Sequence, residues 1–111
     1  MQTTLPTELP TTIQRGFTIT TKFLGPTNTL GSRVKATYKR DNERTWHATV
    51  NWSHSFSAEI NHRHAAELLL ANLNQERAEY FESIGAADEA GKFEVVAMGW
   101  DADHYYFLAA Q

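Results

Sequence analysis

Residues 45–70, TWHATVNWSHSFSAEINHRHAAELLL, decide the fold, because the spacing of their apolar residues changes from two to about 3.6 along the run. In the first half, the apolar residues alternate with polar ones: Trp46, Ala48, Val50 and Trp52. From residue 58 on, the apolar residues recur at helical spacing, and Ser57 is placed to cap the start of a helix. We therefore expect a strand over residues 45–52, followed by a helix that covers its apolar face.

Two further strands are expected upstream, over residues 17–24 and 33–38. Each alternates apolar and polar residues, which is typical of half-buried strands. Their predicted inward residues are Phe17, Ile19 and Phe23 in the first strand and Val34, Ala36 and Tyr38 in the second. The segment 39–43 contains Asp41 and Asn42, which favour a tight turn. The three strands thus form an antiparallel meander with one apolar face.

Downstream, Asn72 and Asn74 predict an interruption of the helix, with a second helical stretch over residues 75–84. Gly85 stops that stretch. Its expected anchors on the core are Tyr80, Phe81 and Ile84. Residues 93–98 and 105–109 resemble a closing hairpin. The predicted fold class is α+β, an antiparallel sheet in the order β-β-β-α-(α)-β-β with the helix packed on one face as a two-layer sandwich.

Length and composition predict one domain without a membrane span. The chain has 111 residues, of which 41% are hydrophobic, so one core is expected. Residues 1–14 are rich in Thr and Pro and predict a flexible arm, whereas residues 15–111 form the domain. Cysteine is absent, which excludes a disulfide scaffold. No apolar run approaches the roughly 20 residues of a membrane span, and no secretion signal is recognisable, so we expect a cytoplasmic protein.

Charge is divided unevenly along the chain. Residues 11–52 carry seven cations against two anions, a net charge of plus five. Residues 53–111 carry three cations against ten anions, a net charge of minus seven. Such a division favours contact between the basic half and phosphate or an acidic partner.

The outward face of the predicted meander is the first candidate binding surface. It combines threonines with four basic residues, Lys22, Arg33, Lys35 and His47, and no carboxylate or aromatic residue is expected there. Cations and hydroxyls suit a phosphate backbone, whereas the lack of aromatic rings argues against base stacking. The alternative is an ordinary exposed pleat, on which Thr and Lys are common.

The loop over residues 25–33 is the second candidate. Its small and polar residues, with Thr27, Asn28 and Ser32 before Arg33, could turn several backbone N–H groups toward an anion as a nest. The glycine spacing does not match a P-loop. The alternative is a long hairpin connection in which Gly and Asn supply positive φ angles.

The histidines and their neighbours form a third group of candidates: His54, Asn61 and His62, as structural residues or ligands. We expect His62 to be neutral, partly buried and bonded to the strand end near His54. A metal site of His54, His62 and Asp101 or Asp103 is the weaker alternative. Nothing in the sequence fixes the closeness that such a metal site requires, and no nucleophile motif is present. We therefore predict no enzyme, no cofactor and no metal.

The acidic half offers an opposite surface. Three residues of the second helical stretch, Glu76, Glu79 and Glu82, could imitate a phosphate track and occupy a basic channel in a partner protein. The alternative is a solvated helix face, because Glu is a favoured surface residue in helices.

Part of the chain resembles a family of small uncharacterised proteins of bacterial phages and plasmids. The resemblance rests on TKFLGPTN at 21–28, GSRVKA at 31–36, Asn61-His62 and the following Ala65-Ala66, and it covers roughly residues 20–73. Such proteins favour Asp-His where this chain has Ser53-His54, so a role of that acid is absent here. The resemblance implies an origin on a mobile element.

Together these features predict a non-enzymatic binding protein of a mobile element. By analogy with its origin, counter-defence of the anti-CRISPR kind is expected, by occupying a host protein or nucleoprotein complex in the bacterial cytoplasm. The alternative is direct binding of nucleic acid or a nucleotide through the basic face and the 25–33 loop, and a metal-dependent hydrolase comes third. Both a monomer and a dimer remain open.

Overall fold

The computed structural model describes residues 4, 8 and 12–111. Its elements follow one another in the order β1 (Phe17–Leu24), β2 (Arg33–Lys39), β3 (Thr45–Asn51), α1 (Ala58–Ser83), a short 3-10 helix (Ala87–Glu89), β4 (Glu94–Trp100) and β5 (Tyr105–Ala110). The predicted α+β class and the order of three strands, helix and two strands are confirmed. Most of the arm predicted for residues 1–14 lies outside the described residues.

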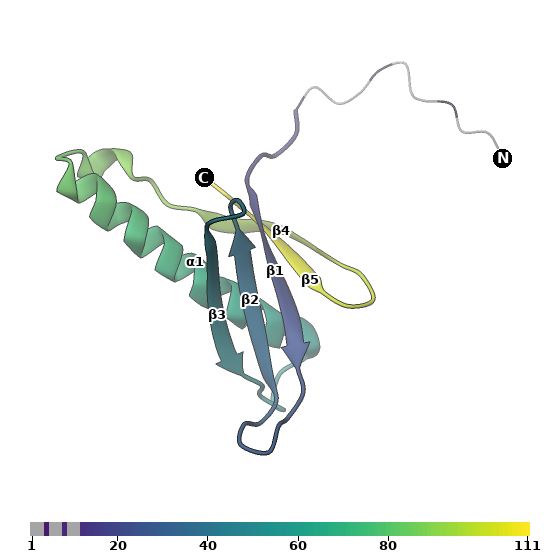
Figure 1. The fold of residues 1–111 in the computed structure, drawn as a ribbon. Helices are drawn as coiled ribbons and strands as arrows, with labels where there is room; N and C mark the ends of the chain where they lie inside the picture. The colour runs from purple at the N-terminus through teal and green to yellow at the C-terminus, as the bar shows by residue number, and fades with distance from the viewer. Residues whose placement is uncertain (1–3, 5–7, 9–11) are drawn as a thin grey trace.

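The five strands form one antiparallel sheet in the order β3-β2-β1-β5-β4. The closing hairpin joins the meander because β5 pairs with β1, which places Phe107 opposite Ile19. In Figure 1 the helix α1 crosses one face of this sheet diagonally, and its C-terminal half extends beyond β3. One face is therefore covered by the helix and the other stays open.

The core lies between α1 and the sheet. Helix residues at helical spacing are buried against it: Asn61, His62, Ala65, Ala66, Leu69 and Leu70. On the sheet side the buried residues are Ile19, Val34, Ala36, Ala48, Phe107 and Ala109. The many alanines on both surfaces let the helix approach the strands closely, and burial of the larger side chains supplies the main stabilisation.

Helix α1 starts as predicted and continues further than predicted. Ser57 is the N-cap, and its Oγ accepts the N–H of Ile60 at 3.2 Å. The helix stops before Gly85, which has a φ of 75°. The predicted interruption at Asn72 and Asn74 is wrong. The Asn74 amide holds the backbone N–H and C=O of Phe93, both at 2.9 Å, and this tertiary contact outweighs the modest helix propensity of Asn.

The predicted inward faces of β2 and β3 are confirmed, whereas β1 holds a polar residue on this side. Thr21 is fully buried there, while Phe23 lies near the sheet end, exposed and edge-on to Trp52.

In the described part of the chain, no helix has the length and apolar character needed to traverse a lipid bilayer.

Candidate binding surfaces

The open face of the sheet gathers the predicted basic residues. Lys22 of β1 lies directly opposite Lys35 of β2, which in turn lies opposite Thr49 of β3. Thr37 lies opposite His47 in the next row, and their side chains are bonded at 3.2 Å. Because directly opposed residues of an antiparallel pair point to the same side, these side chains share the face that α1 leaves open.

Positive charge on this face is not neutralised within the described chain. Like charges that lie directly opposite one another destabilise a sheet. An ion pair with a carboxylate would relieve this repulsion, but neither Lys22 nor Lys35 forms one among residues 12–111. Arg33 is held at the strand start, where its Nε–H donates to the carbonyl of Gly31 at 3.2 Å. The outward residues of β1, β2 and β3 include no carboxylate, as predicted.

Strand β5 adds features that the sequence prediction missed. Tyr106 lies opposite Thr20 and so adds an aromatic ring to the open face beside β1. The outward residues of β1, β2 and β3 themselves include no aromatic residue, as predicted. The hydroxyl of Tyr106 donates to the carboxylate of Asp101 in the β4–β5 turn. The missing signal was the pairing of β5 with β1, which joins residues far apart in the sequence.

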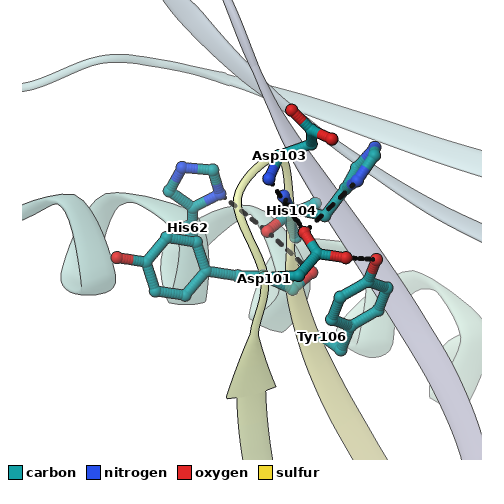
Figure 2. A network of polar contacts seen from close by, with 7 residues as sticks. His62, Asp101, Asp103, His104 and Tyr106 are labelled. Carbon is teal, nitrogen blue, oxygen red and sulfur yellow. Dashed lines mark hydrogen bonds and ion pairs between the residues drawn. The ribbon is translucent and has the colours of Figure 1, made fainter.

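Figure 2 shows the polar contacts of this turn. The carboxylate of Asp101 accepts the hydroxyl of Tyr106 and the backbone N–H groups of Asp103 and His104, and these bonds hold the pKa of Asp101 below its usual value. The same bond to Asp101 raises the pKa of Tyr106. The carboxylate thus closes its own turn.

The metal alternative with His54 and His62 is not formed. Among the described residues, the group with metal-ligand chemistry is instead Asp101, Asp103 and His104, whose ligand atoms lie within 4.8 Å of one another. These residues lie in the exposed turn, and the contacts of Asp101 account for their closeness. Exposed acidic groups of this kind are common without a metal, so the group supports no metal site.

The 25–33 loop does not form the predicted nest. Gly85 and Gly91 have the positive φ angles among the described residues, so neither Asn28 nor the glycines of this loop supply one. The alternative, a hairpin connection in which Gly and Asn have positive φ angles, is therefore wrong in that respect as well. The hydroxyl of Thr27 instead accepts the N–H groups of Thr29 and Leu30, at 3.3 and 3.0 Å. These amides are therefore engaged within the loop, whereas Ser32 leads directly into β2 and its carbonyl accepts the N–H of Trp52 at 2.9 Å.

His62 is buried, but its partner differs from the prediction. Its Nδ1 lies 2.7 Å from the hydroxyl of Thr21 on β1, and its ring stacks on Tyr105 with centroids 4.3 Å apart. Burial lowers the pKa of His62. His54 is exposed and has no part in this contact. The sequence showed that His62 faces the core but not which polar residue would face it.

Asn61 is the residue that fixes the loop after β3. Its Oδ1 accepts the N–H of Ser53 at 2.8 Å, and its Nδ2 donates to the carbonyls of Ser53, Phe56 and Ser57 at 2.9, 3.2 and 3.0 Å. One buried amide thus holds the connection between β3 and α1. Its role is structural.

Glu76, Glu79 and Glu82 are all exposed on the C-terminal half of α1. At a spacing of three, they follow one another along the helix surface. Glu79 accepts a hydrogen bond from Gln75 at 3.2 Å. The acidic residues are therefore available to a partner, on a different part of the molecule from the basic face.

A groove of about 730 Å³ lies where α1 extends past the sheet, and we call it the aromatic groove. It is lined by Phe17, Tyr38, Arg40, Arg44, Trp46, Leu73, Glu76, Arg77, Tyr80, Phe81 and Phe93. The sequence prediction placed Tyr80 and Ile84 as core anchors, which is wrong, because they are 60% and 56% exposed. The helix has left the sheet before it reaches them.

Lowering the pH is expected to destabilise the protein through His62. Because its pKa is lowered in the folded state, the unfolded chain binds the proton more readily. The contribution of neutral His62 to the free energy of unfolding is therefore fully present above the unfolded-state pKa of 6.5, and it is lost as the pH drops below that value. Urea unfolding between about pH 7.5 and 5 measures this. His62→Gln should flatten the pH dependence, whereas His64→Gln, at an exposed position of the same helix, should retain it; the reverse result would contradict the assignment.

Comparisons of the chain with protein-family models, curated proteins and solved structures find no match. The resemblance to phage and plasmid proteins therefore stays a prediction.

Proposed function

We propose that the protein is a non-enzymatic binding module that binds the phosphate backbone of nucleic acid through the open face of β1, β2 and β3. The observation that carries this proposal is the direct opposition of Lys22 and Lys35, without a carboxylate on the outward side of the three strands. Phosphate contacts by Lys and Arg supply affinity through counterion release. The neighbouring threonine hydroxyls supply oriented hydrogen bonds to the backbone.

The electrostatic cost of this face supports a ligand of opposite charge. Neighbouring strands lie about 5 Å apart, so Lys22 and Lys35 repel one another across the pair. A bound polyanion replaces that repulsion with attraction to both ammonium groups. Arg33 and Lys39 extend the charge along the same face of β2, and His47 adds a further group on β3.

The second candidate is occupation of a host protein or nucleoprotein complex, the counter-defence role expected by analogy with an origin on a mobile element. The observation in its favour is the exposed row of Glu76, Glu79 and Glu82 on the C-terminal half of α1. A row of carboxylates there can meet a basic channel of a partner. This candidate requires a protein partner, whereas the first requires nucleic acid.

The salt dependence of binding tests the first proposal. If three or four phosphates are neutralised, the slope of log K against log salt for duplex DNA is roughly minus three. The double replacement Lys22→Ala with Lys35→Ala should reduce that slope by about two units, one for each lost phosphate contact. Fluorescence anisotropy with labelled duplex, titrated at several salt concentrations, gives the slope.

A matched control removes two cations elsewhere, Arg63→Ala with Lys92→Ala. This double variant should keep the wild-type slope. The proposal fails if the wild-type chain shows no salt-sensitive binding to DNA or RNA, or if both double variants lose the same slope. A tagged pull-down from bacterial extract then separates the candidates, because a protein partner of the acidic row survives nuclease treatment and a nucleic-acid partner does not.

A further inference from the structure

We propose that the aromatic groove binds an unpaired nucleotide, with the base stacked on Trp46 and the phosphate held by Arg40 and Arg44. The groove lies on the helix side of the sheet, so it is distinct from the open basic face. This inference deepens the proposed function and rests on it in one respect, namely that nucleic acid is the natural ligand. It specifies single-stranded over duplex nucleic acid.

A row of aromatic rings forms one side of the groove. Phe93 lies edge-on to Phe17 at 5.0 Å, Phe17 lies 4.5 Å from Tyr38, and Tyr38 stacks on Trp46 at 5.5 Å with an angle of 15° between the rings. Trp46 belongs to the edge strand β3, and among the described aromatic pairs it stacks on Tyr38 alone. The row thus ends in a nearly parallel pair of rings at an open edge. A flat base can continue it.

The charge of the groove is positive. Three arginines, Arg40, Arg44 and Arg77, line it against the single carboxylate of Glu76. Arg77 is fixed, because its guanidinium lies 4.8 and 5.3 Å from the ring centres of Phe81 and Phe93 and its Nε–H donates to the carbonyl of Ala90. An anionic ligand is therefore favoured over a neutral one.

Arg40 and Arg44 are available for that anion. They flank the β2–β3 turn, where the N–H of Arg40 donates to the carbonyl of Arg44 at 3.0 Å. The nearby Asp41 carboxylate accepts the N–H groups of Glu43 and Arg44, both at 2.8 Å, so it closes the turn. Neither arginine forms an ion pair among residues 12–111. Their guanidinium groups are suited to bidentate contact with a phosphate.

The position of Trp46 connects the groove with the basic face. Trp46 and His47 are neighbours on β3, and successive residues of a strand point to opposite faces. A single strand bound along the basic face can therefore pass over the edge of β3 and place a base in the groove. Aromatic rings beside a positively charged track are the usual means of binding single strands, and this combination favours a nucleotide over an acidic peptide.

The test measures the affinity of the full chain for labelled single-stranded oligothymidylate and for a duplex of the same length. Trp46→Leu should weaken single-strand binding by about 5- to 150-fold, the effect of one stacked base, and leave duplex binding unchanged. The matched control Trp100→Leu changes an exposed tryptophan of β4 and should leave both affinities unchanged.

Because Trp46 is partly buried, Arg44→Gln provides an independent variant in an exposed turn. It should lower single-strand affinity and reduce its salt slope by about one unit, whereas Arg63→Gln should not. Competition by thymidine monophosphate would indicate that a free nucleotide suffices, and competition by oligothymidylate alone would assign the groove to a strand; either result supports the proposed chemistry.

Three outcomes separate this inference from the proposed function. If the folded variants Trp46→Leu and Arg44→Gln bind single strands as tightly as the wild type, the inference is overturned. The proposed function of the basic face would not be affected by that result. Trp46-dependent binding of a Glu-Tyr copolymer in place of oligothymidylate would also overturn it, because the groove would then bind an acidic protein. Loss of single-strand binding in Trp46→Leu, together with no duplex binding by the wild type, would support the groove and overturn the duplex contact of the basic face.

Discussion

Leu69→Ala is expected to lower the free energy of unfolding by about 2–5 kcal/mol, the range for a large-to-small change in a closed core. Leu69 is 1% exposed and lies between α1 and the sheet, within the cluster that includes Val34 and Ala48. Its removal deletes buried apolar contacts and leaves a cavity that alanine cannot fill. Urea unfolding, followed by circular dichroism, measures the change.

The neighbouring residue supplies the matched control. Leu68 is 42% exposed, about 100° around the helix from Leu69, so Leu68→Ala removes the same atoms from a more exposed position. Its cost should remain within about 0.5 kcal/mol, as for Lys35→Ala on the open sheet face. Equal losses at Leu68 and Leu69 would mean that the buried side of α1 has been assigned wrongly.

Local periodicity predicted the elements well because each element has one buried side. A period of two identified β1, β2 and β3, and the N-cap at Ser57 located the start of α1. The same period placed Lys22 and Lys35 on one outward face, where the register confirms them. These features depend on residues that are close in sequence or joined by short turns.

Features that depend on distant pairs were not predictable. The pairing of Thr21 with His62 requires the exact angle at which α1 crosses β1, and periodicity carries no information on that angle. The same angle decides where the helix leaves the sheet. Tyr80 and Phe81 have the spacing of core anchors, yet they line a groove because the sheet has ended beneath them.

The aromatic groove illustrates how a binding surface arises from this geometry. Tyr38 and Trp46 have the inward pattern of core residues, and they do face the helix side of the sheet. Because α1 diverges toward its C-terminus, their rings are covered only in part. A pattern that normally indicates a core therefore also supplies a stacking surface at the edge of β3.

Asn61→Ala is expected to lower the free energy of unfolding by about 1–3 kcal/mol, the cost of leaving a buried polar group without a partner. The main group that loses its partner is the N–H of Ser53. Asn61 is 1% exposed, and its amide satisfies four backbone bonds in the loop before α1. Alanine can replace none of them. Urea unfolding gives the cost, and faster hydrogen exchange at the Ser53 amide locates it.

Asn72→Ala is the control for Asn61→Ala, because Asn72 is an exposed asparagine within the same helix. Alanine has the higher helix propensity, so this variant should be neutral or slightly more stable, by up to about 0.7 kcal/mol. The groove lies at the other end of α1, so Asn61→Ala should weaken the fold without changing the single-strand affinity of the folded fraction. If the apparent affinity of the whole sample falls only in proportion to the fraction of folded protein, the role of Asn61 is structural. A larger fall would place the 53–57 loop in the binding surface.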